Sequence, residues 1–209
     1  MLDNKGFDLW ADGYDKSVNI SEENNEYPFA GYKGVLNYIY NVVREKNEAD
    51  VLDIGFGTGV LTTQLYNAGC SIAGIDFSQN MIDIAKEKMP DALLIKCDFS
   101  HGLPEEIKSM KFDFIISTYA IHHLTDEQKI EFIKSLFTLL KENGQILIGD
   151  VSFENRSQLE DCKEKYAHYW DEDEIYFTEE EIREALPAEY CCKYVKISHC
   201  AGVLAVEEK

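Results

Sequence analysis

The chain has 209 residues, 45% of them hydrophobic, so we expect one domain over residues 1–209 with a sizeable core. The net charge of −19 disfavours nucleic acid and anionic membranes as partners, because both reward a basic surface. A transmembrane run, a signal peptide and a C-x-x-C pair are absent from the sequence, so we expect a reduced, cytoplasmic protein without a metal site.

Residues 1–47 are expected to form an N-terminal lid and the first helix. The residues before Phe29 are polar with scattered aromatics, and residues 29–46 have the apolar spacing of an amphipathic helix. Trp10 and Tyr14 are four positions apart, so a short helix would place both on one face. We expect Tyr14 to contact a cofactor beneath the lid. The alternative is that Trp10 only anchors a frayed end.

Residues 48–150 alternate between strand and helix patterns and are expected to form a cofactor-binding core. The capping signals are Ser78 and the pair of Thr125 with Gln128. Such alternation is typical of a parallel sheet with helices on both faces. The expected strands are residues 49–56, 71–77, 92–99, 111–119 and 145–153. The expected helices are residues 58–69, 79–89 and 125–144.

Residues 151–209 are expected to supply substrate-side helices and a closing hairpin. The helices are predicted at residues 156–170 and 179–186, and the strands at 190–198 and 202–208. The link between these strands is too short for a crossover helix, so they should pair antiparallel. The complete prediction is a Rossmann-like, doubly wound α/β fold with seven strands, mostly parallel.

The stretch VLDIGFGTG, residues 51–59, contains glycines at positions 55, 57 and 59. A glycine turn between a strand and a helix is a common place for a nucleotide-like ligand. Asp53 lies two residues before Gly55, where its carboxylate would repel a pyrophosphate and attract an ammonium or sulfonium group. The simpler alternatives are a tight turn without ligand and an aspartate that only caps it.

Asp76 follows Gly55 by 21 residues and ends the second predicted strand. An acid at this position can accept hydrogen bonds from both ribose hydroxyls. Phe77 and Met81 are expected to pack on the ribose or adenine. The alternatives are an Asp76 that serves the next helix as a cap and a Met81 that belongs to the core.

The third and fourth strands end in further candidate residues. Asp98 is expected to accept the exocyclic amine of adenine, with Cys97 and Phe99 beside the ring. The fourth strand ends in STYAIHHL, which places five candidates near the reacting end of the cofactor. One histidine of the pair could instead bond only to backbone. These five are Ser117, Thr118, Tyr119, His122 and His123.

The ordered motifs VLDIGFGTG, GIDFS, KCDF and FDFIISTYAIHHL resemble those of class I S-adenosylmethionine-dependent methyltransferases over residues 48–150. The segments FDLWADGYDKSV and FAGYKGVLNYI resemble small stand-alone bacterial methyltransferases found beside sulfur-amino-acid recycling genes. The resemblance implies that S-adenosylmethionine binds and leaves as S-adenosylhomocysteine. It also implies specific contacts: Gly55, Phe56, Gly57 and Gly59 under the methionine end with Asp53 behind them, Asp76 at the ribose, Asp98 at the adenine and Ser117 facing the methionine.

The run STYA departs from family members that methylate nucleic-acid bases or protein amides, which carry Asn or Asp, prolines and an aromatic there. The resemblance therefore implies direct methyl transfer to a small molecule. Tyr119, His122 or His123 would act as base if the acceptor must lose a proton. Two alternatives are an NAD-dependent oxidoreductase and a non-catalytic S-adenosylmethionine or S-adenosylhomocysteine binding module. Neither the acceptor nor the oligomeric state can be predicted.

Overall fold

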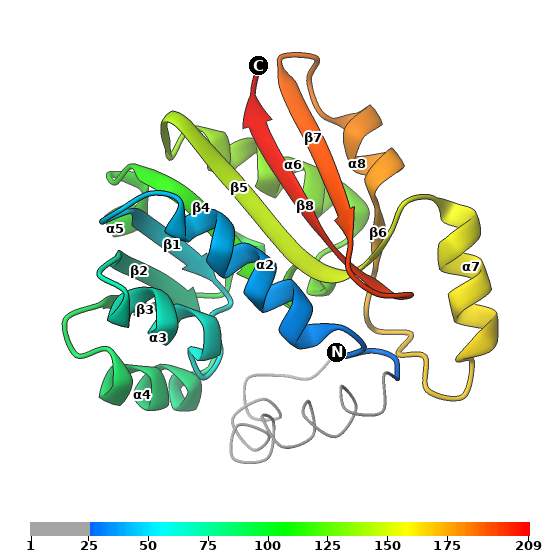
Figure 1. Ribbon diagram of the computed structural model, residues 1–209, viewed down its shortest axis with the longest axis horizontal. Helices are drawn as coiled ribbons and strands as arrows, with labels where there is room; N and C mark the ends of the chain where they lie inside the picture. The colour runs from blue at the N-terminus through cyan, green and yellow to red at the C-terminus, as the bar shows by residue number, and fades with distance from the viewer. Residues whose placement is uncertain (1–25) are drawn as a thin grey trace.

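The fold, seen in a computed structural model that describes residues 26–209, is a central sheet with helices on both faces (Figure 1). Tyr14 and most of the expected lid lie outside the described residues. The strands are β1 Asp50–Ile54, β2 Ser71–Asp76, β3 Leu93–Lys96, β4 Phe112–Thr118, β5 Leu140–Phe153, β6 Phe177–Thr178, β7 Tyr190–Lys196 and β8 Ala201–Glu208. The helices are α2 Tyr32–Arg44, α3 Val60–Asn67, α4 Gln79–Lys88, α5 Glu105–Lys108, α6 Asp126–Phe137, α7 Arg156–Lys165 and α8 Glu179–Ala185, with 3₁₀ turns η1 Phe99–His101 and η2 Ile121–His123.

The sheet has the order β3-β2-β1-β4-β5-β8-β7. The first five of these strands run parallel, and β8 pairs antiparallel with both β5 and β7. This confirms the predicted mostly parallel sheet with an antiparallel hairpin. The sequence did not predict β6, a short strand that pairs with the end of β5 beside the seven-stranded path.

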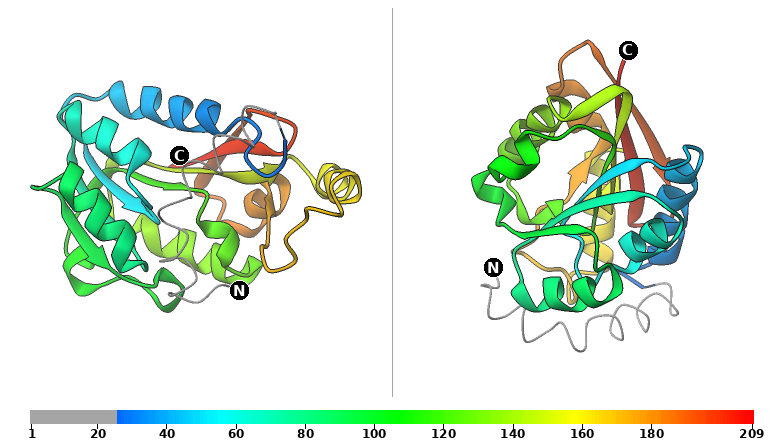
Figure 2. Two further views of the ribbon diagram at one scale, coloured as in Figure 1. Left: turned by 90° about the horizontal axis from the view of Figure 1, so that it is seen from below. Right: turned by 90° about the vertical axis from the view of Figure 1, so that its left-hand side faces the viewer.

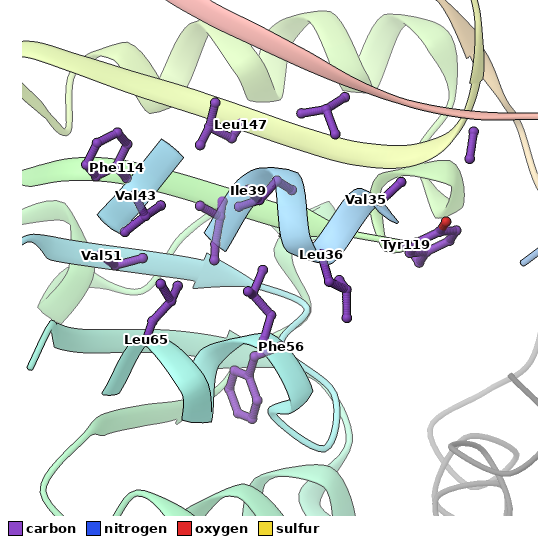
Figure 3. Packing of buried hydrophobic residues seen from close by; sticks show 14 of the residues in the cluster. Val35, Leu36, Ile39, Val43, Val51, Phe56, Leu65, Phe114, Tyr119 and Leu147 are labelled. Atoms are coloured by element: carbon purple, nitrogen blue, oxygen red, sulfur yellow. The ribbon is translucent and has the colours of Figure 1, made fainter. Parts of the chain in front are cut away.

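Two apolar layers cover the sheet (Figure 2). Successive residues of β1 point to opposite faces, so Val51 packs in the layer with α2, α3, α4 and α7, and Leu52 packs in the layer with α5, α6 and α8. Figure 3 shows α2 laying Ile39 and Val43 over the sheet beside Leu147. Burial on both faces explains why the parallel strands are almost continuously apolar.

Helix α6 begins as predicted and ends earlier than predicted. Thr125 and Gln128 form the expected capping box. The helix stops at Phe137, whereas the sequence pattern continued to residue 144. The reason is a tertiary contact: the chain from Leu140 onward pairs with Phe112 of β4 and joins the long strand β5. Helix α7 is also shorter than predicted and ends at Lys165.

Within residues 26–209, the helices lack the combination of length and apolar character needed to cross a membrane.

Candidate functional site

A cleft opens at the carboxyl ends of β1, β2 and β4. The strand order of the sheet reverses at this point, because β2 and β3 lie on one side of β1 and β4 and β5 lie on the other. Ligands of open α/β sheets bind at this switch point. The cleft holds about 770 Å³ of empty space, including the part open to solvent. Eleven of the residues predicted from the sequence line it: Asp53, Gly55, Phe56, Gly57, Asp76, Phe77, Met81, Phe99, Thr118, Tyr119 and His123.

The glycine turn forms the floor of the cleft. Gly55 and Gly57 have φ angles of 72° and 57°, in the left-handed region that favours glycine. A Cβ atom at Gly55 would lie 2.5 Å from the Cβ atom of Ala120, so the turn also needs glycine for space. A Cβ atom at Gly57 would meet no heavy atom within 4 Å. Gly59 caps α3 and does not line the cleft.

Asp76 ties the glycine turn to the next helix. Its Oδ2 atom accepts a hydrogen bond of 2.9 Å from the backbone N–H of Gly57, and its Oδ1 atom accepts one of 2.9 Å from Ser78. This is the local role that we considered as the alternative to ribose binding. A carboxylate has about four acceptor positions, so these two bonds leave capacity for ligand hydroxyls. Both roles are therefore geometrically compatible.

Asp53 is a buried carboxylate at the inner wall of the cleft. Its side chain is 1% exposed, and its Oδ2 atom accepts a short hydrogen bond from the hydroxyl of Thr62. Its Oδ1 atom has no hydrogen-bond partner among residues 26–209. Burial raises the pKa of Asp53 to about 7, and the nearby carboxylate of Asp76 adds to this. A cationic group in the cleft would satisfy both the orphaned oxygen and the buried charge.

The end of β3 places one of its three predicted residues in the cleft. Phe99 is buried and lines the cavity. Asp98 turns outward as the cap of η1 and accepts bonds of 3.0 and 2.6 Å from the backbone N–H and hydroxyl of Ser100. The thiol of Cys97 donates to the carbonyl of Gly102. Cys97 and Asp98 therefore lie outside the lining described for this cleft.

The end of β4 turns one of its candidate residues away from the cleft and two toward it. Ser117 points away from it and donates a 3.0 Å bond to the carbonyl of Ile54. Thr118 and Tyr119 line the cavity. Tyr119 has φ of 51°, which is uncommon for a residue with a side chain and often marks a functional site. Its ring centroid is 5.1 Å from that of Tyr32 and 5.6 Å from that of Phe29.

The two adjacent histidines have different environments. His123 lines the cleft, and burial together with the neighbouring charge of His122 lowers its pKa to about 4. It is therefore a neutral imidazole at physiological pH. Its ring contacts that of His122 edge-on, with centroids 4.3 Å apart.

His122 lies behind His123, among carboxylates. Its Nδ1 atom is 2.7 Å from Asp150 Oδ1, and its Nε2 atom is 3.5 Å from Glu174 Oε1. Burial lowers the pKa of His122, but attraction to Asp150 and Glu174 outweighs this, so the pKa stands above its usual value. His122 is thus held between two carboxylates, and sequence spacing gave no indication of these two partners.

Several lining residues were missed by the sequence analysis. Tyr32 and Leu36 are four positions apart on α2, so both lie on one face of this helix. A search of the sequence for that face could have found them. Thr62 follows Asp53 by nine residues, and only the folded helix brings its hydroxyl to the carboxylate. The others are Thr58, Val60, Leu61, Ser78 and Ala120. Among residues 26–209, no three His, Cys, Asp or Glu side chains converge to hold a metal ion.

Comparisons with known proteins match the chain to a described family of domains. Residues 51–144 match the family model described as "Methyltransferase domain". An uncharacterized methyltransferase from Anoxybacillus flavithermus is 41% identical over 155 residues, covering 74% of this chain and 69% of the relative. Another from Alkaliphilus oremlandii is 33% identical over 187 residues, covering 90% and 81%.

Solved structures show the same fold at low sequence identity. The DhpI–SAH complex has a TM-score of 0.72 at 15% identity and covers 98% of this chain and 94% of its own. Magnesium protoporphyrin IX methyltransferase from Synechocystis PCC 6803 with bound SAH has a TM-score of 0.68 at 17% identity, with coverages of 87% and 85%.

Proposed function

Because the chain belongs to the class I S-adenosylmethionine-dependent methyltransferases, we propose that it transfers the cofactor's methyl group directly to a small molecule. The observation that carries the proposal is Asp53, whose buried, orphaned oxygen borders a cleft floored by Gly55 and Gly57. A nicotinamide dinucleotide would place its pyrophosphate near this carboxylate, which disfavours the oxidoreductase alternative.

The residues at the cofactor end are suited to S-adenosylmethionine, which supplies an electrophilic sulfonium methyl when bound. Asp53 would face its cationic amino acid end, and Gly57 leaves room above the turn because a Cβ atom there would meet nothing. Asp76 would accept the ribose hydroxyls while still holding the turn. Phe77 and Met81 line the wall beside Asp76 and would cover the nucleoside.

At the acceptor end, the rings of Tyr32 and Tyr119 lie 5.1 Å apart in the cleft wall. Aromatic faces near a sulfonium stabilise it by roughly 0.5–2 kcal/mol. Alignment of the two reactants contributes more, up to about 7–11 kcal/mol for well-oriented groups. The main task of the residues at this end is therefore to orient the acceptor and exclude water.

His123 is the candidate base where the acceptor must lose a proton. It lines the cleft and is neutral, so a ring nitrogen can accept a proton as the acceptor atom forms its bond to the methyl carbon. The carbon–sulfur bond breaks in the same step. His122 does not line the cleft. Its contacts with Asp150 and Glu174 hold its ring against that of His123, which makes it a positioning residue for His123.

A small acceptor is also favoured by charge. The net charge of −19 opposes binding to nucleic acid, and the STYA run lacks the groups that hold base or amide nitrogen. We propose that residues 48–150 bind the cofactor, and that residues 151–209 help to shape the acceptor side. Glu174 supports this division, because it approaches His122 from the second region.

The test is a screen for S-adenosylhomocysteine release, with pooled small metabolites, total RNA and total protein as separate acceptor fractions. We expect turnover only with the metabolite fraction, and its loss in Asp76→Ala. Turnover confined to RNA or protein would contradict the proposal. With an active metabolite, a chiral methyl group should be transferred with inversion, since retention would require a covalent enzyme intermediate.

A further inference from the structure

A second hollow lies between α7 and the turn that joins β7 to β8. It holds about 910 Å³ of empty space, is open to solvent, and shares no lining residue with the cofactor cleft among residues 26–209. Figure 1 shows α7 at the side of the molecule, next to the loop between the last two strands. Neither the proposed methyl transfer nor the family motifs involve this hollow.

The hollow is basic in a strongly acidic protein. Lys165, Lys196 and His199 line it together with a single carboxylate, that of Asp161. Neither lysine forms an ion pair with a carboxylate of residues 26–209. The Nζ atom of Lys196 donates a 2.9 Å bond to the neutral amide of Gln158.

Two lysines on the same helix and strand do form ion pairs, in contrast to Lys165 and Lys196. Lys163 is on the same helix as Lys165, and its Nζ atom lies 2.9 Å from Glu172. On the same strand as Lys196, Lys193 lies 2.6 Å from Glu207. The two lysines that face the hollow therefore have no carboxylate that neutralises them among residues 26–209, although acidic residues outnumber basic residues by 39 to 20 in the chain. The Nζ atom of Lys165 lies 4.9 Å from the centroid of the Tyr166 ring, a contact that keeps its positive charge.

The charges of Lys165 and Lys196 both act on the imidazole of His199. Burial lowers its pKa, and the charges of Lys165 and Lys196 lower it further. Its Nε2 atom is buried and has no hydrogen-bond partner among residues 26–209. The ring stacks on Tyr166 with centroids 5.4 Å apart and planes 24° apart, which fixes its orientation.

The turn that carries His199 is held from both sides. The hydroxyl of Ser198 donates a 2.6 Å bond to the carbonyl of Ala30 and accepts bonds of 3.2 and 3.1 Å from the backbone N–H groups of Cys200 and Ala201. The position of the imidazole is therefore set before any ligand arrives. Preorganised donors lose less entropy on binding.

We propose that this hollow binds the oxyanion group of a small metabolite, a phosphate or a carboxylate, between Lys165, Lys196 and His199. Two ammonium groups and an imidazole N–H supply charge-assisted hydrogen bonds to such an anion. Binding an anion would also relieve the repulsion that the lysines exert on protonated His199. The site is independent of the methyl-transfer cleft and does not depend on its proposed function.

The experiment is an NMR titration of the histidine ring signals in the full-length protein, with His199→Gln assigning the signal. Inorganic phosphate is compared with acetate and with sodium chloride at matched ionic strength. We expect phosphate or acetate to move the midpoint of the His199 titration upward by roughly half a pH unit relative to chloride. The arm with the larger shift identifies the preferred oxyanion. No shift in either arm would overturn the proposal.

Variants separate a built site from general screening. Lys165→Gln and Lys196→Gln should each weaken phosphate or acetate binding at least tenfold, while Lys163→Gln on the same helix should leave it unchanged. An equal loss in all three would indicate nonspecific attraction and refute the site. S-adenosylhomocysteine affinity, measured by calorimetry on the same variants, should stay unchanged, so failure of this proposal is distinguishable from failure of the methyltransferase proposal.

Discussion

The two ends of the cofactor cleft are built in different ways. At the β1–β2 end, the key contacts join residues close in sequence, such as Asp53 with Thr62 and Asp76 with Gly57. At the β4–β5 end, they join distant residues, such as His122 with Asp150 and Glu174. The first end consists mainly of a backbone turn and two carboxylates, and the second of rings and a buried ion pair.

This difference suits the two ends to different tasks: the first to binding a cofactor that many proteins share, and the second to a reaction specific to this protein. A backbone turn and local acids can bind the same cofactor wherever the motif recurs. Rings and buried charges supplied by distant segments can change without disturbing that turn. We therefore expect substitutions at the β1–β2 end to change cofactor affinity, and substitutions at the β4–β5 end to change turnover.

The largest effect is expected from Asp76→Ala. It removes the proposed ribose acceptor and the carboxylate that accepts from the N–H groups of Gly57 and Ser78, so cofactor affinity should fall by about 1.5–3 kcal/mol, roughly 10- to 150-fold. Calorimetry with S-adenosylhomocysteine measures this. Asp98→Ala is the comparison, because Asp98 lies outside the cleft lining, and it should cost much less. An equal loss in both would show that the adenine reaches Asp98.

A second prediction concerns Gly57→Ala, with Gly69→Ala as the matched control. Both glycines have positive φ, 57° and 92°, and in both a Cβ atom would meet nothing within 4 Å. Each change should therefore cost about 1–2 kcal/mol of folding stability. Only Gly57 borders the cleft, so only its substitution should also weaken cofactor binding, by about tenfold. Thermal melts with and without S-adenosylhomocysteine separate the two effects, and equal ligand shifts would contradict the assignment.

A third prediction follows from Asp53. Its pKa of about 7 means that a cationic cofactor must ionise it, so binding should release a proton and weaken roughly tenfold between pH 8 and pH 6. Calorimetry in buffers of different ionisation enthalpy measures the number of protons released on binding. Asp53→Asn should bind more weakly and lose the pH dependence. A dependence that survives this change would have to come from Asp76 or another group.

The same carboxyl also affects folding. The pKa of Asp53 is higher in the folded than in the unfolded chain, so the folded state binds the extra proton between the two values. Its contribution to stability is therefore fully present below the unfolded pKa and is lost as pH rises through about 7. Asp53→Asn should flatten this part of the stability profile, as measured by denaturant unfolding across the pH range.

The smallest effect is expected from metal removal. The Nδ1 atom of His122 bonds to Asp150, and its Nε2 atom faces Glu174. Residues 26–209 contain no cluster of three His, Cys, Asp or Glu side chains that could hold a metal ion. A chelator should leave cofactor affinity and turnover unchanged. A loss that a divalent ion restores would identify His122, His123 and Asp150 as ligands and would change the account of the acceptor end.

Sequence spacing placed Gly55, Gly57 and Asp76 at one cleft because the geometry there is local. A strand, a glycine turn and an acid after the next strand fix the positions of these three residues. The same reasoning did not foresee that Asp98 lies outside the cleft lining, because the chain turns into η1 directly after β3 and the carboxylate caps that turn. Helix α6 was predicted too long because the pairing of Leu140 with Phe112 is a tertiary contact.

The acceptor end was only partly predictable. Tyr119 and His123 were found because they follow a strand end, and both line the cleft. The division of roles between the two histidines depends on Asp150 and Glu174, 28 and 52 residues further along the chain than His122. No periodicity or motif indicates which distant carboxylates will meet a buried ring. This information exists only in the folded chain.

The short strand β6 has a consequence for how this protein can diversify. Phe177 and Thr178 pair with Ser152 and Phe153, so the excursion over residues 154–176 starts and ends at neighbouring points of the sheet. A loop with fixed, adjacent ends can be lengthened or exchanged at little entropic cost. The excursion is thus attached to the sheet at a single place. A graft between Phe153 and Phe177 that keeps the apolar contacts of α7 would replace Glu174 beside His122 and preserve every strand of the glycine-turn half.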